Sequence, residues 1–87
     1  MPKPLPLPDD LLPLHAAAVE ADRAMTATRE AGGDVDAARD AYVAAALALR
    51  AHPIWEEARG AACYAQTWQA SLDAAKAHLD DEEQAAA

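Results

Sequence analysis

From Pro53 to about Asp80, apolar residues recur at alternating steps of four and three, which predicts one long helix with a single apolar side. The other side of this stretch carries charged and amide side chains, as a face in water would. At 1.5 Å per residue, a helix over residues 53–80 would be about 40 Å long. An apolar stripe of that length needs other helices packed against it. The predicted stripe consists of Ile54, Ala58, Ala61, Ala65, Trp68, Leu72, Ala75 and Leu79.

A first helix is predicted over residues 10–31. Asp10 is placed to cap its N-terminus, because a short polar side chain there can accept a bond from a free backbone N–H. The pair Gly32-Gly33 should end it, since glycine adopts the left-handed conformation that closes many helices. The inner stripe of this helix should consist of Leu14, Ala18, Ala21, Met25 and Thr28.

A second helix is predicted over residues 34–51, with Asp34 as its N-cap. Val43 and Leu47 lie to one side of its inner stripe, and this extra apolar width indicates a helix that is contacted on two sides. The inner stripe itself should be Val35, Ala38, Tyr42, Ala45, Ala46 and Leu49. The predicted fold class is therefore all-α, a three-helix up-down-up bundle.

The two ends of the chain differ from this helical region. Five of the first thirteen residues are prolines, and their alternation over residues 1–9 predicts an extended arm instead of a helix. Leu5 and Leu7 on that arm could lie across an apolar groove. The single domain should span residues 10–81. An acidic, alanine-containing tail over residues 82–87 is expected to be disordered, because its acids oppose the helix dipole.

Composition limits how stable such a domain can be. The chain has 87 residues, of which 26 are alanine and none is phenylalanine, so its 53% apolar content includes few large side chains. At about 25 cal/mol per Å² of buried apolar surface, a core of this kind gives only modest net stability. Close helix packing through alanine, or self-association, would add buried surface. We therefore expect a homo-oligomer, in the first instance a dimer.

The net charge of −8 bears on partners. It disfavours direct binding to nucleic acid and to anionic membranes, both of which require clustered basic residues. It would suit a basic protein partner. No stretch is long and apolar enough to predict a membrane span, no signal peptide is predicted, and a lone cysteine fits a reducing compartment, so we expect a cytoplasmic protein.

No residue pattern predicts catalysis, a cofactor or a metal site. His15, His52 and His78 are scattered and do not form a helical metal-ligand pair. Cys63 has only Arg59 within one helical turn to favour a thiolate, so we expect it to be a packed small residue. The tyrosines and tryptophans could line a pocket, but they are expected to be core aromatics.

These patterns leave three functional hypotheses. The first is a non-enzymatic protein–protein interaction module that self-associates through the long third helix. The second is an acidic inhibitor that mimics nucleic acid and binds a basic DNA- or RNA-binding protein. The third is a small-ligand binder or enzyme that uses the Trp/Tyr cluster. Trp68 should be the core anchor and Trp55 a surface aromatic. The candidate interaction residues are Trp55, Trp68, Leu72, Leu79, Leu5 and Leu7.

Overall fold

The computed structural model describes residues 2–86, and within this range the chain forms four helices and no strands. The all-α prediction is therefore confirmed, whereas the three-helix count is wrong. The helices are α1 (Leu11–Ala31), α2 (Val35–Arg50), α3 (Ile54–Gly60) and α4 (Tyr64–Ala86).

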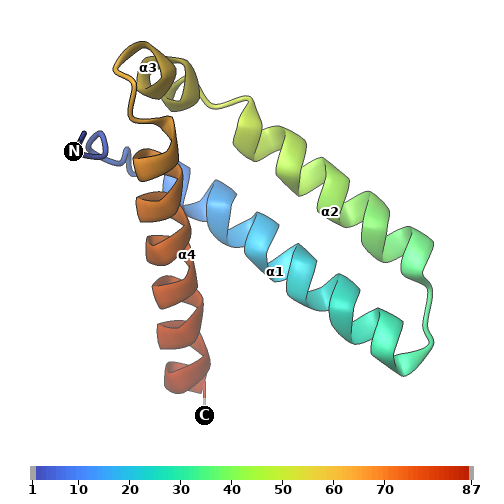
Figure 1. Ribbon diagram of the computed structural model, residues 1–87. Coiled ribbons are helices and arrows are strands. Elements are labelled where there is room, and N and C mark those ends of the chain that lie inside the picture. The colour runs from blue at the N-terminus through green and yellow to red at the C-terminus, as the bar shows by residue number, and fades with distance from the viewer. Residues whose placement is uncertain (1, 87) are drawn as a thin grey trace.

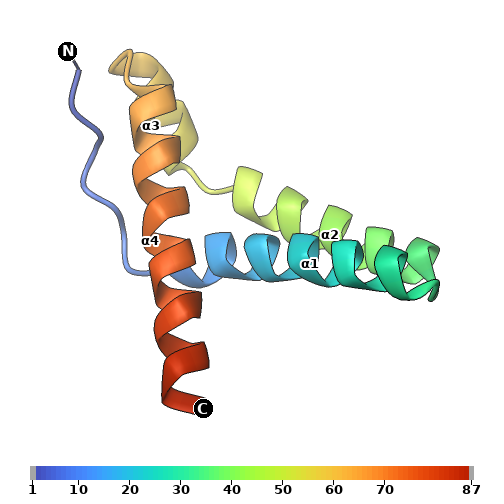
Figure 2. The same cartoon turned by 60° about the horizontal axis from the view of Figure 1, so that its bottom comes forward.

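The helices α1 and α2 form an antiparallel hairpin, and α4 crosses the start of that hairpin (Figure 1). Helix α1 packs against both α2 and α4, whereas α2 and α4 have at most a weak contact with each other. The free end of the hairpin projects away from α4, so the molecule is elongated, with extents of 43 × 29 × 22 Å (Figure 2).

The hairpin turn follows the predicted cap chemistry. Gly32 has a φ of 73°, and its N–H and that of Gly33 donate to the carbonyls of Arg29 and Thr28. These two bonds form a Schellman motif, which satisfies two of the four free carbonyls at the end of α1. The Asp34 side chain accepts from the Ala37 N–H at 3.1 Å and caps α2 as predicted.

The predicted third helix over residues 53–80 is wrong, because the chain turns at residues 61–63. The Ala62 N–H donates to the Arg59 carbonyl and the Cys63 N–H donates to the Ala58 carbonyl, which is a second Schellman motif. Ala62 occupies the left-handed position with a φ of 56°. The turn buries Cys63 and starts α4 in a new direction. The continuous stripe therefore does not exist.

The core consists of two clusters of buried residues. The larger one joins α1, α2 and α3, and the smaller one fills the crossing of α1 with α4. Ala61 and Ala65 from the predicted stripe are exposed. The buried line of α4 instead follows steps of four through Thr67, Ser71, Ala75 and Leu79. The larger cluster consists of Leu11, Ala18, Leu49, Ile54 and Trp55, and the smaller one of Ala16, Ala75 and Leu79.

The N-terminal arm packs against this core, and the C-terminal residues extend α4. The N-terminal arm runs beside α4 (Figure 2), where the Leu5 N–H donates to Thr67 Oγ1 at 3.1 Å and the Leu5 side chain packs on the larger cluster. At the other end, the predicted tail is helical as far as Ala86, and residue 87 lies outside the described residues. An i,i+4 contact of 3.0 Å between His78 and Glu82 supports this last part of α4.

Candidate functional site

The residues predicted for interaction do not form one external surface. Trp55, expected at the surface, is only 2% exposed, and Leu79 is 7% exposed. Trp68 and Leu72 are half-buried, and only Leu7 is among the exposed large apolar residues. The helix predicted over residues 53–80 is divided into α3 and α4, and apolar side chains expected on its surface are buried inside the protein.

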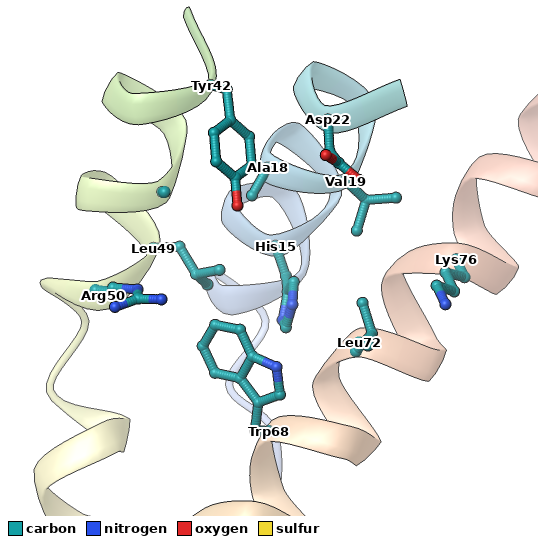
Figure 3. A pocket seen from close by; sticks show the side chains of 11 residues that line it. His15, Ala18, Val19, Asp22, Tyr42, Leu49, Arg50, Trp68, Leu72 and Lys76 are labelled. Atoms are coloured by element: carbon teal, nitrogen blue, oxygen red, sulfur yellow. The ribbon is translucent and has the colours of Figure 1, made fainter. Parts of the chain in front are cut away.

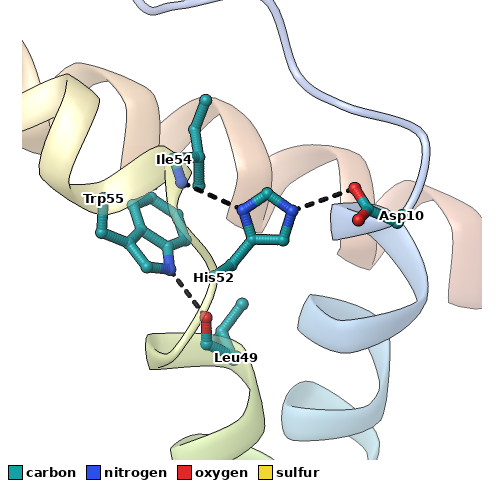
Figure 4. A network of polar contacts seen from close by, with 5 residues as sticks. All are labelled: Asp10, Leu49, His52, Ile54 and Trp55. Carbon is teal, nitrogen blue, oxygen red and sulfur yellow. Dashed lines mark hydrogen bonds and ion pairs between the residues drawn. The ribbon is translucent and has the colours of Figure 1, made fainter.

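Trp55 is buried because the turn after α2 points it inward. Its Nε1–H donates to the Leu49 carbonyl at 2.8 Å (Figure 4). Its ring lies 4.9 Å from that of Trp68. The Tyr64 ring lies 5.6 Å from that of Trp55. The aromatic cluster is thus a structural element that joins α3 to α4.

His15 completes this cluster from α1. Its ring is 4.8 Å from the Trp68 ring, and its Nδ1 forms a buried hydrogen bond with the Ser71 hydroxyl of α4. Burial lowers the pKa of His15 below its ordinary value of 6.5, because the charged imidazolium would lose its hydration. We therefore assign a neutral imidazole to this position at neutral pH.

Along the sequence, His15 is one of three scattered histidines. A signal for its burial was present, because Leu11, His15 and Ala18 are spaced at steps of four and three on one face of α1. The partner Ser71, by contrast, was not predictable, since the pairing depends on where α4 crosses α1.

A cavity of about 320 Å³ lies between α1, α2 and α4, next to this cluster (Figure 3). Trp68 and Leu72 lie on the α4 side, and His15 projects into it from α1. Two of the predicted interaction residues thus contribute to one site, although it is concave instead of protruding. The cavity is lined by His15, Ala18, Val19, Asp22, Tyr42, Ala46, Leu49, Arg50, Trp68, Leu72 and Lys76.

Three charged residues lie at the rim of the cavity. Arg50 comes from α2, Lys76 from α4 and Asp22 from α1. Within residues 2–86, neither Arg50 nor Lys76 forms an ion pair or a side-chain hydrogen bond. The rim therefore carries a net positive charge in a chain whose total charge is −8.

A second feature is the exposed side of α2. Val43 is 46% exposed and Leu47 is 65% exposed, and they lie one turn apart on the same side of the helix. Asp40 and Arg50 continue this line at its two ends and are also exposed. We call these four residues the α2 row. The second contact that the apolar width of this helix predicted is not made within the described chain.

Three further features bear on metal binding, on the lone cysteine and on the membrane. No group of three or more metal-ligating side chains occurs between residues 2 and 86, and Cys63 is buried. None of the helices in that range is long and apolar enough to cross a membrane. No protein-family model matches the chain, and neither a curated protein nor a solved structure is significantly similar to it.

Proposed function

We propose that the protein is a non-enzymatic helical interaction module that pairs with a second copy of itself through the α2 row. The observation that carries this proposal is the exposure of Val43 and Leu47 at adjacent turns of one helix. Large apolar side chains that cluster on a surface favour association, because their burial releases ordered water. The long stripe first expected to mediate self-association is not available, because Leu79 is buried against α1.

The chemistry of the α2 row favours an antiparallel pairing of identical helices. Asp40, Val43, Leu47 and Arg50 follow one another at steps of three, four and three. In an antiparallel pair, Val43 of each copy faces Leu47 of the other, and Asp40 faces Arg50. The row is thus self-complementary in shape and in charge, as a two-fold symmetric interface requires.

Small residues beside the row would allow the two helices to approach closely. Ala44 and Ala48 are exposed and flank Leu47 on the outward side of α2. A helix of 16 residues is about 24 Å long, so one helix pair buries less than the roughly 1,600 Å² of a standard interface. The dimer should therefore be weak and dependent on concentration.

Light scattering during size exclusion tests this proposal over about a hundredfold range of protein concentration. The wild-type protein should shift from monomer to dimer, and Leu47→Glu should remain a monomer at all concentrations. Leu7→Glu is the matched control, since it makes the same change at another exposed leucine. A dimer that persists in Leu47→Glu would contradict the proposed surface.

A charge exchange tests the antiparallel arrangement separately. Asp40→Arg alone places two cations opposite each other, and Arg50→Asp alone places two anions opposite each other, so each should weaken the dimer. The double variant restores two opposite-charge pairs and should restore dimerisation. If the double variant dimerises as weakly as the single variants, the two helices must pair in another orientation.

A further inference from the structure

The cavity between α1, α2 and α4 contains a buried polar side chain whose second polar atom has no protein partner. His15 is 2% exposed, and its Nδ1 is paired with Ser71. Its Nε2 makes no hydrogen bond in the described chain. Every fully buried polar side-chain atom in that part of the chain has a partner, so Nε2 is not fully buried. Nε2 therefore keeps its small accessible area, and His15 lines the cavity (Figure 3).

The remaining walls provide a flat apolar surface beside this nitrogen. Trp68 presents its indole ring, and Val19 and Leu72 close the side between α1 and α4 (Figure 3). A flat hydrocarbon or aromatic body would stack on the indole and displace water from these side chains. The walls alone would select for apolarity and shape, without any preference for charge.

Charge at the rim supplies that preference. Lys76 and Arg50 lack partners within residues 2–86, and they face the cavity from opposite helices. A carboxylate at the rim would be attracted by both charges and would receive donors from the nearer of the two. Nε2–H of His15 could donate to the ligand as well when the Ser71 hydroxyl donates to Nδ1. Asp22 is the one acidic residue that lines the cavity, and it opposes an anion.

We propose that this cavity binds a small planar carboxylate, with its apolar body on Trp68 beside Nε2 of His15 and its carboxylate at the rim, where the charges of Lys76 and Arg50 attract it. A volume of about 320 Å³ is at the lower end of the range for ligand sites and accommodates a two-ring molecule. At the ligand efficiency of ordinary small molecules, about 13 heavy atoms give a Kd of about 1 mM. The negative charge of the whole chain also keeps the affinity for an anion low.

Titration with 2-naphthoate, followed by the NMR signal of the His15 ring and by tryptophan fluorescence, tests this proposal. The neutral 2-naphthamide has nearly the same shape and should bind roughly fivefold more weakly, because it lacks the charge. The His15 signal, assigned with His15→Gln, should shift with naphthoate and saturate. Equal affinity for the amide and the acid would overturn the carboxylate assignment.

Two rim variants should change the affinity in opposite directions. Lys76→Gln should weaken naphthoate binding roughly threefold to fivefold, and Asp22→Asn should strengthen it by a similar factor. Both residues are exposed and unpaired in the described chain, so both variants should keep the wild-type circular dichroism spectrum. A merely structural role would not produce opposite effects, and unchanged affinity in both variants would refute the site.

The site and the proposed dimer can be tested independently. Arg50 belongs to both, so it is left unchanged in the ligand experiment. At protein concentrations where the wild type is also monomeric, Leu47→Glu should bind naphthoate with wild-type affinity if the cavity acts alone. Loss of naphthoate binding in Leu47→Glu would overturn the single-chain site. The solution mass of the same variant, measured by light scattering, tests the dimer.

Discussion

Nε2 of His52 lies 2.9 Å from Oδ1 of Asp10, which connects the link between α2 and α3 to the start of α1 (Figure 4). The other ring nitrogen of His52 accepts from the Ile54 N–H at 3.0 Å, so in the neutral ring Nε2 carries the proton and donates it to Asp10. Asp10 was expected to cap α1 with its side chain. It makes no such bond, because its backbone is already helical (φ −77°, ψ −11°) instead of extended, and its carboxylate accepts from His52.

This bond predicts a measurable coupling between two positions 42 residues apart. Asp10→Ala should lower the free energy of unfolding by about 1 kcal/mol, and His52→Ala by about 2 kcal/mol, because His52 loses two hydrogen bonds. Urea unfolding of both single variants and the double variant gives the coupling energy, which should be about 0.5–1 kcal/mol. Strictly additive effects would show that the bond contributes nothing to stability.

The two Schellman motifs make a matched pair of predictions. Gly32 occupies the left-handed position after α1, whereas Ala62 occupies the same position after α3. Ala62→Gly should raise the free energy of unfolding by about 0.5–1 kcal/mol, since relief of the left-handed strain exceeds the added chain entropy. Thermal unfolding measures the change, and destabilisation would contradict a left-handed residue 62.

Gly60 gives the complementary test two residues earlier. It is the last residue of α3, and a Cβ added there would meet no atom within 4 Å. Gly60→Ala should therefore stabilise the protein by about 0.5–1 kcal/mol through helix propensity alone. Gly32→Ala is the contrasting variant, because alanine would be strained at a φ of 73°, and it should destabilise.

The same comparison shows why the sequence predicted some helix ends and missed others. Gly32 and Asp34 are local signals, so the turn between α1 and α2 could be located from residue types alone. The turn at residues 61–63 has alanine at its left-handed position, which is a poor turn signal. The apolar spacing continues across it, and Gly60 alone indicated weakness there. Periodicity therefore predicted one helix where the chain forms two.

The candidate site was predictable only in part. Trp68 and Leu72 were named from the apolar pattern, and both line the cavity. The apolar spacing places Lys76 on the polar side of residues 53–80, and no sequence pattern assigns His15 to a site. These two residues come from α1 and α4, which cross at an angle that depends on the turn at residues 61–63. Sequence spacing within one helix carries no information about that angle.

The two tryptophans should respond differently to the same substitution. Trp55→Phe removes a buried hydrogen bond to the Leu49 carbonyl and leaves a small void, so it should cost about 2 kcal/mol. The Leu49 carbonyl also accepts from the His52 N–H, which limits the loss. Trp68→Phe should cost about 1 kcal/mol or less, because Trp68 is half-buried. Urea unfolding followed by circular dichroism measures both, and equal costs would contradict the structural role of the Trp55 bond.

The buried His15 should make the stability of the protein depend on pH. Burial lowers its pKa in the folded protein below 6.5, so the unfolded chain binds more protons as the pH falls below that value. Stability should therefore be fully present above about pH 7.5, and it should fall by up to about 1.4 kcal/mol by about pH 5.5. Urea unfolding at these two pH values tests this, with His15→Gln as the control. That variant should be less stable at neutral pH but should lose less on acidification, whereas an equal loss in both proteins would assign the pH dependence to other groups.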